Sequence, residues 1–84
     1  MVMKCIVNVN PGLQASPASS FVQTANRFSS EIYLTKGERR VNAKSIMGLL
    51  SLAIAKGDTI ELKATGGDSD EAIQALGDFL RQDN

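Results

Sequence analysis

The chain has 84 residues, enough for one domain with a single small core. Nine basic and nine acidic residues give a formal net charge of zero, so no overall field directs the protein to nucleic acid or acidic lipid. The absence of histidine excludes histidine-based acid–base catalysis and the usual zinc ligand sets. We expect no secretory signal and no membrane-spanning segment, and therefore a cytoplasmic protein. The lone Cys5 lies in an apolar run and is expected to be a buried thiol.

The first third of the chain predicts a strand followed by a helix. Residues 2–9 mix alternation with a short apolar patch, as a strand does, and Asn10-Pro11-Gly12 turns the chain. A helix then starts at Ser16-Pro17 or at Ala15, because proline fits the first turn of a helix. Its buried stripe is expected to comprise Ala18, Phe21, Val22, Ala25 and Phe28.

A β-hairpin is predicted next. Residues 31–36 alternate in polarity, with Ile32 and Leu34 on the side that faces the core. Gly37 turns the chain, and residues 38–43 return as a more polar strand at or near the edge of a sheet.

A short apolar helix is predicted over residues 46–54. Ser45 is a good N-cap, because its side-chain oxygen can accept a hydrogen bond from an unpaired N–H of the first turn. Lys56 and Gly57 suit a helix end, since they supply a cation near the negative terminus and a residue that takes positive φ.

The last quarter of the chain predicts a strand and a third helix. Residues 59–64 alternate cleanly, and Asp68 with Glu71 three positions later form a capping box. The buried stripe of this helix is expected to comprise Ala72, Ile73, Leu76, Phe79 and Leu80. The order βαββαβα predicts one α+β domain over residues 1–84, with three helices on one face of a mostly antiparallel sheet.

The helix after Ser45 carries more apolar side chains than one buried face needs. Leu49, Leu52 and Ala53 share one side, while Ile46, Met47 and Leu50 spread around the rest. One interpretation is a docking surface whose serine is phosphorylated, because the free N–H groups and the helix dipole there favour an anion. The other is that Ser45 is only a cap and the apolar excess belongs to the core. The residues alone leave both open.

Basic residues gather before this helix. Lys36, Arg39, Arg40 and Lys44 are expected to form a basic rim beside Ser45, either as phosphate contacts or as a solvated face. For Lys44 we expect solvation rather than phosphate binding.

Three segments carry a family resemblance: Gly12-Leu-Gln14-Ala-Ser16-Pro-Ala18, residues 21–28 and residues 41–48. Here the chain resembles the HPr family, the small phosphocarriers of the sugar phosphotransferase system, and the likeness spans essentially the whole chain. The resemblance implies an open-faced β-sandwich with a four-stranded sheet in the order 1-4-2-3.

The family's phosphocarrier motif is altered. HPr proteins carry their phosphoryl group on a histidine within Gly-Leu/Ile-His-Ala-Arg-Pro-Ala, where the arginine neutralises the phosphate. Gln14 stands at the histidine position and Ser16 at the arginine position. Because a carboxamide has no basic nitrogen, it cannot accept a phosphoryl group as imidazole does. The resemblance therefore implies a degenerate site without histidine phosphocarrier activity.

The second family motif, which ends in Lys44-Ser45-Ile46-Met47-Gly48, is intact. The resemblance implies that HPr kinase/phosphorylase modifies Ser45, and that the product is the corepressor of a LacI-type catabolite control protein in Gram-positive carbon catabolite repression. A regulatory branch of the family has glutamine for histidine and keeps only this role, and the chain resembles it most, although that branch usually keeps the arginine. The expected partner interface comprises Ile46, Met47, Leu50, Gln14, Ser16 and Lys44.

The sequence leaves two other functions open. An HPr-fold module with a different protein target is the main alternative, and a direct nucleic-acid-binding module is less favoured because net charge is zero and aromatic residues are few. We expect no enzyme, cofactor or metal site. The assembly is expected to be a monomer or a strand-swapped dimer, with residues 10–12 as the hinge.

Overall fold

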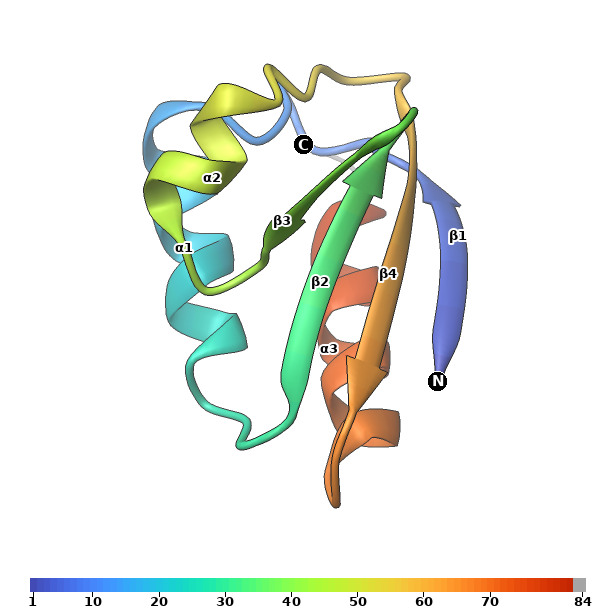
Figure 1. Ribbon diagram of the computed structural model, residues 1–84. Helices are drawn as coiled ribbons and strands as arrows, with labels where there is room; N and C mark the ends of the chain where they lie inside the picture. Colours follow the sequence, from blue (N-terminus) through green and yellow to red (C-terminus); the bar gives the residue numbers. More distant parts are fainter. Residues whose placement is uncertain (83–84) are drawn as a thin grey trace.

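The computed structural model describes residues 1–82 and has the predicted order of elements (Figure 1). The strands and helices are β1 (Val2–Ile6), α1 (Ala15–Ala25), β2 (Glu31–Lys36), β3 (Arg39–Asn42), α2 (Ile46–Ser51), β4 (Thr59–Thr65) and α3 (Ser69–Leu80).

The four strands form one antiparallel sheet in the order β1-β4-β2-β3. This order confirms the one that the family resemblance implied. The central strands β2 and β4 pair buried residues with each other, as Leu34 does with Leu62. β3 lies at one edge of the sheet, as its more polar sequence predicted, and β1 lies at the other.

The helices cover one face of the sheet and enclose the core (Figure 1). The predicted alternation of β2 and β4 and the stripes of α1 and α3 supply most of its side chains, because burial repeats with the period of each element. The rings of Phe21 and Phe79 meet edge to face with centroids 5.7 Å apart, which fixes α1 against α3.

The first strand is shorter than predicted. It ends at Ile6. Val7 and Val9, which follow, are buried outside any strand, and the backbone here bonds to the segment before β4 and to the end of α3. Val7 N–H donates to the Asp58 carbonyl, and Asn8 N–H donates to the Leu80 carbonyl. Cys5 is buried as predicted, and burial raises the pKa of its thiol.

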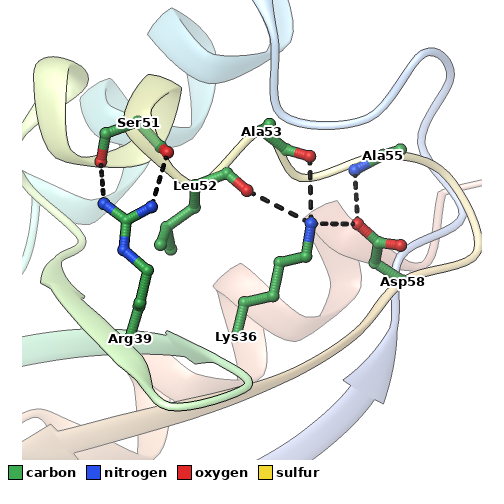
Figure 2. Close-up of polar contacts among 7 residues, drawn as sticks. All are labelled: Lys36, Arg39, Ser51, Leu52, Ala53, Ala55 and Asp58. Atoms are coloured by element: carbon green, nitrogen blue, oxygen red, sulfur yellow. Dashed lines mark hydrogen bonds and ion pairs between the residues drawn. The ribbon is translucent and has the colours of Figure 1, made fainter.

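The helix α2 is also shorter than predicted, since it ends at Ser51 and not near Lys56. Ala53 takes a left-handed backbone conformation with φ of 49°, and this turns Ile54 into the core. In a longer helix, backbone N–H groups would bind the carbonyls of Leu52 and Ala53. Here the Lys36 ammonium donates to both carbonyls instead, at 3.2 Å (Figure 2).

A carboxylate completes this arrangement. Asp58 pairs with the Lys36 ammonium at 2.9 Å and accepts a hydrogen bond from Ala55 N–H at 2.8 Å (Figure 2). These two contacts lower the pKa of the Asp58 carboxyl, with the Ala55 bond as the larger cause. The segment between α2 and β4 is therefore fixed by polar contacts to the end of β2.

Asp68 does not form the predicted capping box. It is the N-cap residue of α3, but its side chain makes no cap hydrogen bond. The carboxylate instead accepts from the backbone N–H of Ser29 at 2.8 Å and of Ser30 at 3.0 Å, and from both serine hydroxyls. Tertiary partners thus replaced the local cap. Asp70 and Glu71 do lie in the first turn, where the dipole favours acids.

Acidification is expected to weaken the fold through Asp68. Hydrogen bonds from Ser30 and Ser29 lower the pKa of its carboxyl below the ordinary 3.8. A lowered pKa means that the ionised form stabilises the fold above the unfolded pKa, and that this contribution is lost as pH falls through the folded pKa. The difference in free energy of unfolding between wild type and Asp68→Asn should therefore be largest near neutral pH and shrink below pH 3.8. Urea unfolding at several pH values measures it.

Asp70→Asn is the matched control, because Asp70 is an exposed acid two residues later. Its effect on the free energy of unfolding should be much smaller than that of Asp68→Asn, because Asp68, and not Asp70, accepts the hydrogen bonds from Ser29 and Ser30. A constant difference between wild type and Asp68→Asn across the acid range would contradict the prediction.

Candidate functional site

Ser45 caps α2 as predicted. Its backbone is extended, with φ of −109° and ψ of 111°, and its Oγ accepts a hydrogen bond from Gly48 N–H at 3.1 Å. The chain turns into this position because the Asn42 side chain accepts from Lys44 N–H at 2.8 Å and the Asn42 carbonyl accepts from Ser45 N–H at 3.0 Å. Ser45 is half-buried, and it lies at the end of the helix where the first backbone N–H groups have no partner within the helix.

The apolar excess of α2 faces solvent. Leu49 and Leu52 are buried, whereas the exposed fractions are 37% for Ile46, 74% for Met47 and 43% for Leu50. We call these last three residues the docking face. The alternative that places all of them in the core is wrong. Three large apolar side chains exposed on one short helix are a candidate interaction site.

Two expectations for the residues around α2 are also wrong. Ala53 was expected to share the buried side of Leu49, but it is exposed because the helix ends before it. Lys44 was expected to be solvated, but its ammonium is half-buried and donates to the Phe28 carbonyl at 2.7 Å. Lys44 therefore fixes the start of α2 to the end of α1.

The predicted basic rim beside Ser45 is not formed. Arg39 donates to the Ser51 carbonyl, at the far end of α2 (Figure 2). Arg40 lies on the opposite side of β3, because successive residues of a strand alternate, and its guanidinium sits 4.5 Å from the centroid of the Tyr33 ring. Lys36 is held by Asp58 and two carbonyls. Lys44 alone of the four stays beside Ser45 in sequence and in space.

The residues of the degenerate phosphocarrier motif are exposed at the start of α1. Gln14 is the N-cap residue, with an extended backbone, and its side chain makes no cap hydrogen bond. Ala15 takes a left-handed conformation with φ of 51°, which costs an alanine about 1 kcal/mol. Ser16 is exposed beside them. Neither Gln14 nor Ser16 supplies a group that could carry phosphate as a histidine–arginine pair does.

The two motifs meet opposite ends of α2. The start of α1 is tied to the segment after α2, because Leu13 N–H donates to the Ile54 carbonyl at 3.0 Å. The segment before α2 is tied to the end of α1 by Lys44 and Phe28. The helices α1 and α2 thus lie side by side and run in opposite senses (Figure 1). Gln14 and Ser16, at the start of α1, therefore lie toward the C-terminal end of α2, whereas Ser45 lies at its N-terminal end.

Sequence analysis placed Arg39 in a basic rim beside Ser45 and did not identify Ser51, at the other end of α2, as its partner. The alternation of side chains along β3 indicates that Arg39 and Arg40 face opposite sides of the strand. It does not show which of the two meets α2, because that depends on where α2 ends.

Residues 1–82 show neither a metal cluster nor a membrane-spanning helix. These residues contain no group of three His, Cys, Asp or Glu side chains placed to hold a metal ion. Over the same range, no helix combines the length and apolar character needed to cross a bilayer.

Comparisons with known proteins agree with this geometry. Residues 3–82 match the family model of the PTS HPr component phosphorylation site. The chain is 54% identical over 77 residues to the HPr-like protein Crh of Halalkalibacterium halodurans, a match that covers 92% of each chain.

Solved structures agree as well. The crystal structure of the phosphocarrier protein HPr from Bacillus anthracis superposes with a TM-score of 0.95 at 44% identity, covering 96% of each chain. Crh from Bacillus subtilis, whose crystal structure is described as a domain-swapped dimer, superposes with a TM-score of 0.80 at 46% identity. That match covers 98% of this chain and 94% of that one.

The fold, the strand order and these matches all support one assignment. The resemblance to the HPr family is therefore confirmed, and HPr-like proteins named Crh are among the similar relatives. The chain belongs to the HPr family of phosphocarrier-type proteins, with HPr-like proteins named Crh among its relatives.

Proposed function

We propose that this protein is a regulatory phosphoprotein of carbon catabolite repression. HPr kinase/phosphorylase modifies Ser45, and a LacI-type catabolite control protein binds the phosphorylated form. One observation carries the proposal: Ser45 caps α2 beside an exposed apolar face, while Gln14 occupies the position of the phosphocarrier histidine. The chain keeps the chemistry of the regulatory site and has lost that of the carrier site.

Phosphorylation at this position should leave the fold almost unchanged. The phosphoryl group adds close to two negative charges where the α2 dipole and free N–H groups favour an anion. At a helix end of this exposure, the dipole contributes only about 0.3–1 kcal/mol. The change of function must therefore come from recognition by a partner.

The docking face supplies the rest of the binding energy. Met47 and Leu50 are exposed in the free protein, and burying apolar side chains in a partner contributes about 25 cal/mol per Å² removed from water. A partner arginine or lysine that meets the phosphate adds charge-assisted hydrogen bonds, which are about twice as strong as neutral ones. Burial of the docking face thus contributes affinity for the partner, and the phosphate makes strong binding depend on modification of Ser45.

Incubation with ATP and HPr kinase/phosphorylase tests the modification. Intact mass and peptide mapping should show one phosphoryl group, on Ser45. Incubation with a phosphohistidine donor protein and no kinase should add none, because Gln14 has no nucleophilic nitrogen. Absence of phosphate on Ser45 after the kinase reaction would sink the proposal, and phosphate transfer from the phosphohistidine donor would show a carrier function.

We also propose strand exchange as the route to any dimer of this chain. The Bacillus subtilis Crh crystal structure is described as domain-swapped. In this chain β1 is an edge strand of the sheet, and residues 10–12, the expected hinge, lie in the segment that connects it to α1. Sedimentation velocity over a wide concentration range measures the assembly, and monomer at every concentration would remove this proposal.

A further inference from the structure

We infer that Arg39 is a second charged contact of the docking face, and that the partner presents a carboxylate to it. This inference rests on the proposed function, because it describes the surface that reads phosphorylated Ser45. It adds a residue from β3 to an interface otherwise supplied by α1, α2 and the segment before α2.

The guanidinium of Arg39 is fixed before any partner arrives. It donates to the Ser51 carbonyl at 3.1 Å and to the Ser51 hydroxyl oxygen at 3.4 Å, as Figure 2 shows. The same hydroxyl donates to the Gly48 carbonyl at 2.6 Å, so it is itself held by the helix. A side chain held in this way loses less conformational entropy on binding than a free one.

The charge of Arg39 remains available. Two of the five N–H groups of a guanidinium are used here, and the residue is exposed. No carboxylate within residues 1–82 forms an ion pair with it, whereas Lys36 is paired with Asp58 at 2.9 Å. Arg40 is turned to the other face of the sheet, over Tyr33. Of the basic residues on the β2–β3 hairpin, Arg39 is the one presented toward α2 with unused donors.

Arg39 borders the docking face at the end opposite to Ser45. Its anchor Ser51 lies four positions after Met47, and residues four apart share a helix face. The six residues of α2 rise by about 9 Å, at 1.5 Å for each residue. Phosphorylated Ser45 and Arg39 would therefore flank the apolar side chains with opposite charges. The matching partner surface is an apolar socket with a cation at one end and a carboxylate at the other.

Charge reversal tests this surface, with Arg40 as the matched control. Ser45-phosphorylated wild type, Arg39→Glu, Arg39→Lys and Arg40→Glu are titrated against the catabolite control protein at low and high salt. Arg39→Glu should weaken binding about tenfold at low salt, with the loss shrinking at high salt, because screening reduces a charge contact. Arg39→Lys should retain most of the affinity, and Arg40→Glu should stay within about twofold of wild type.

Structural damage has a different signature. If Arg39→Glu acted by fraying the end of α2, hydrogen exchange of the α2 amides would rise and the loss of affinity would persist at high salt. That result overturns the inference, as does equal binding by Arg39→Glu and Arg40→Glu. If phosphorylated wild type itself does not bind the repressor, both this inference and the proposed function are wrong.

Discussion

Replacement of Ser45 by alanine is expected to weaken binding to the catabolite control protein by about 100-fold or more after treatment with kinase and ATP. Hydrogen bonds to charged groups contribute about 1.5–3 kcal/mol each, so two bonds to a phosphate account for this factor. The variant also loses the cap bond to Gly48 N–H, which costs about 1 kcal/mol of stability. Calorimetric titration of repressor with each treated protein measures the affinity.

The variant Ser45→Asn separates the phosphate from the cap. Asparagine is as good an N-cap as serine but has no hydroxyl to modify. We expect Ser45→Asn to keep nearly the wild-type free energy of unfolding and still to lose affinity as fully as Ser45→Ala. Wild-type affinity in treated Ser45→Asn would show that the cap geometry, and not the phosphate, is what the repressor recognises.

Most of the fold could be predicted because its signals are local. Ile32 and Leu34 repeat with the period of a strand, and Ile73 and Leu76 with that of a helix, so each element shows in the sequence which side it buries. The order of strands could not be obtained this way. Pairing of β1 with β4 joins residues far apart in the chain, and only the family resemblance supplied it.

The errors fall where a tertiary contact replaces a local one. Asp68 has the spacing of a capping box, yet two serines from the loop before β2 take its carboxylate. The pattern over residues 46–54 is helical throughout, yet Lys36 binds the carbonyls of Leu52 and Ala53 and the chain leaves the helix. Neither partner could be identified from sequence spacing.

The residues of the candidate site also differ in whether local sequence reveals them. Ser45 could be found because an N-cap is read from neighbouring residues, and its cap bond is the one predicted. The position of Arg39 could not be found in this way. It depends on where α2 ends and on which side of β3 faces that helix. Local chemistry identified Ser45 as the cap of α2, and only the fold located Arg39 at the opposite end of that helix.

Replacement of Gly12 by alanine is expected to cause the largest loss of stability of any single change proposed. Gly12 has φ of +116°, and an added Cβ would lie 2.7 Å from the Ala55 Cα and 2.9 Å from the Ala55 carbonyl carbon. These are backbone atoms that no side-chain rotation can move away. Backbone strain of about 1–3 kcal/mol and overpacking of about 1–3 kcal/mol should combine to lower the melting temperature by roughly 8–48 °C.

Gly57→Ala isolates the steric part of this effect. Gly57 has a similar φ of +97°, but nothing lies within 4 Å of its added Cβ, so it should suffer the backbone strain alone. Thermal unfolding of both variants measures the difference. Because the close approach of Gly12 to Ala55 joins the start of α1 to the end of α2, the clash should also displace Gln14 and raise hydrogen exchange at Leu13 N–H. Equal melting temperatures for the two variants would mean that this junction yields easily, and that Gln14 and the docking face are not held in a fixed relation.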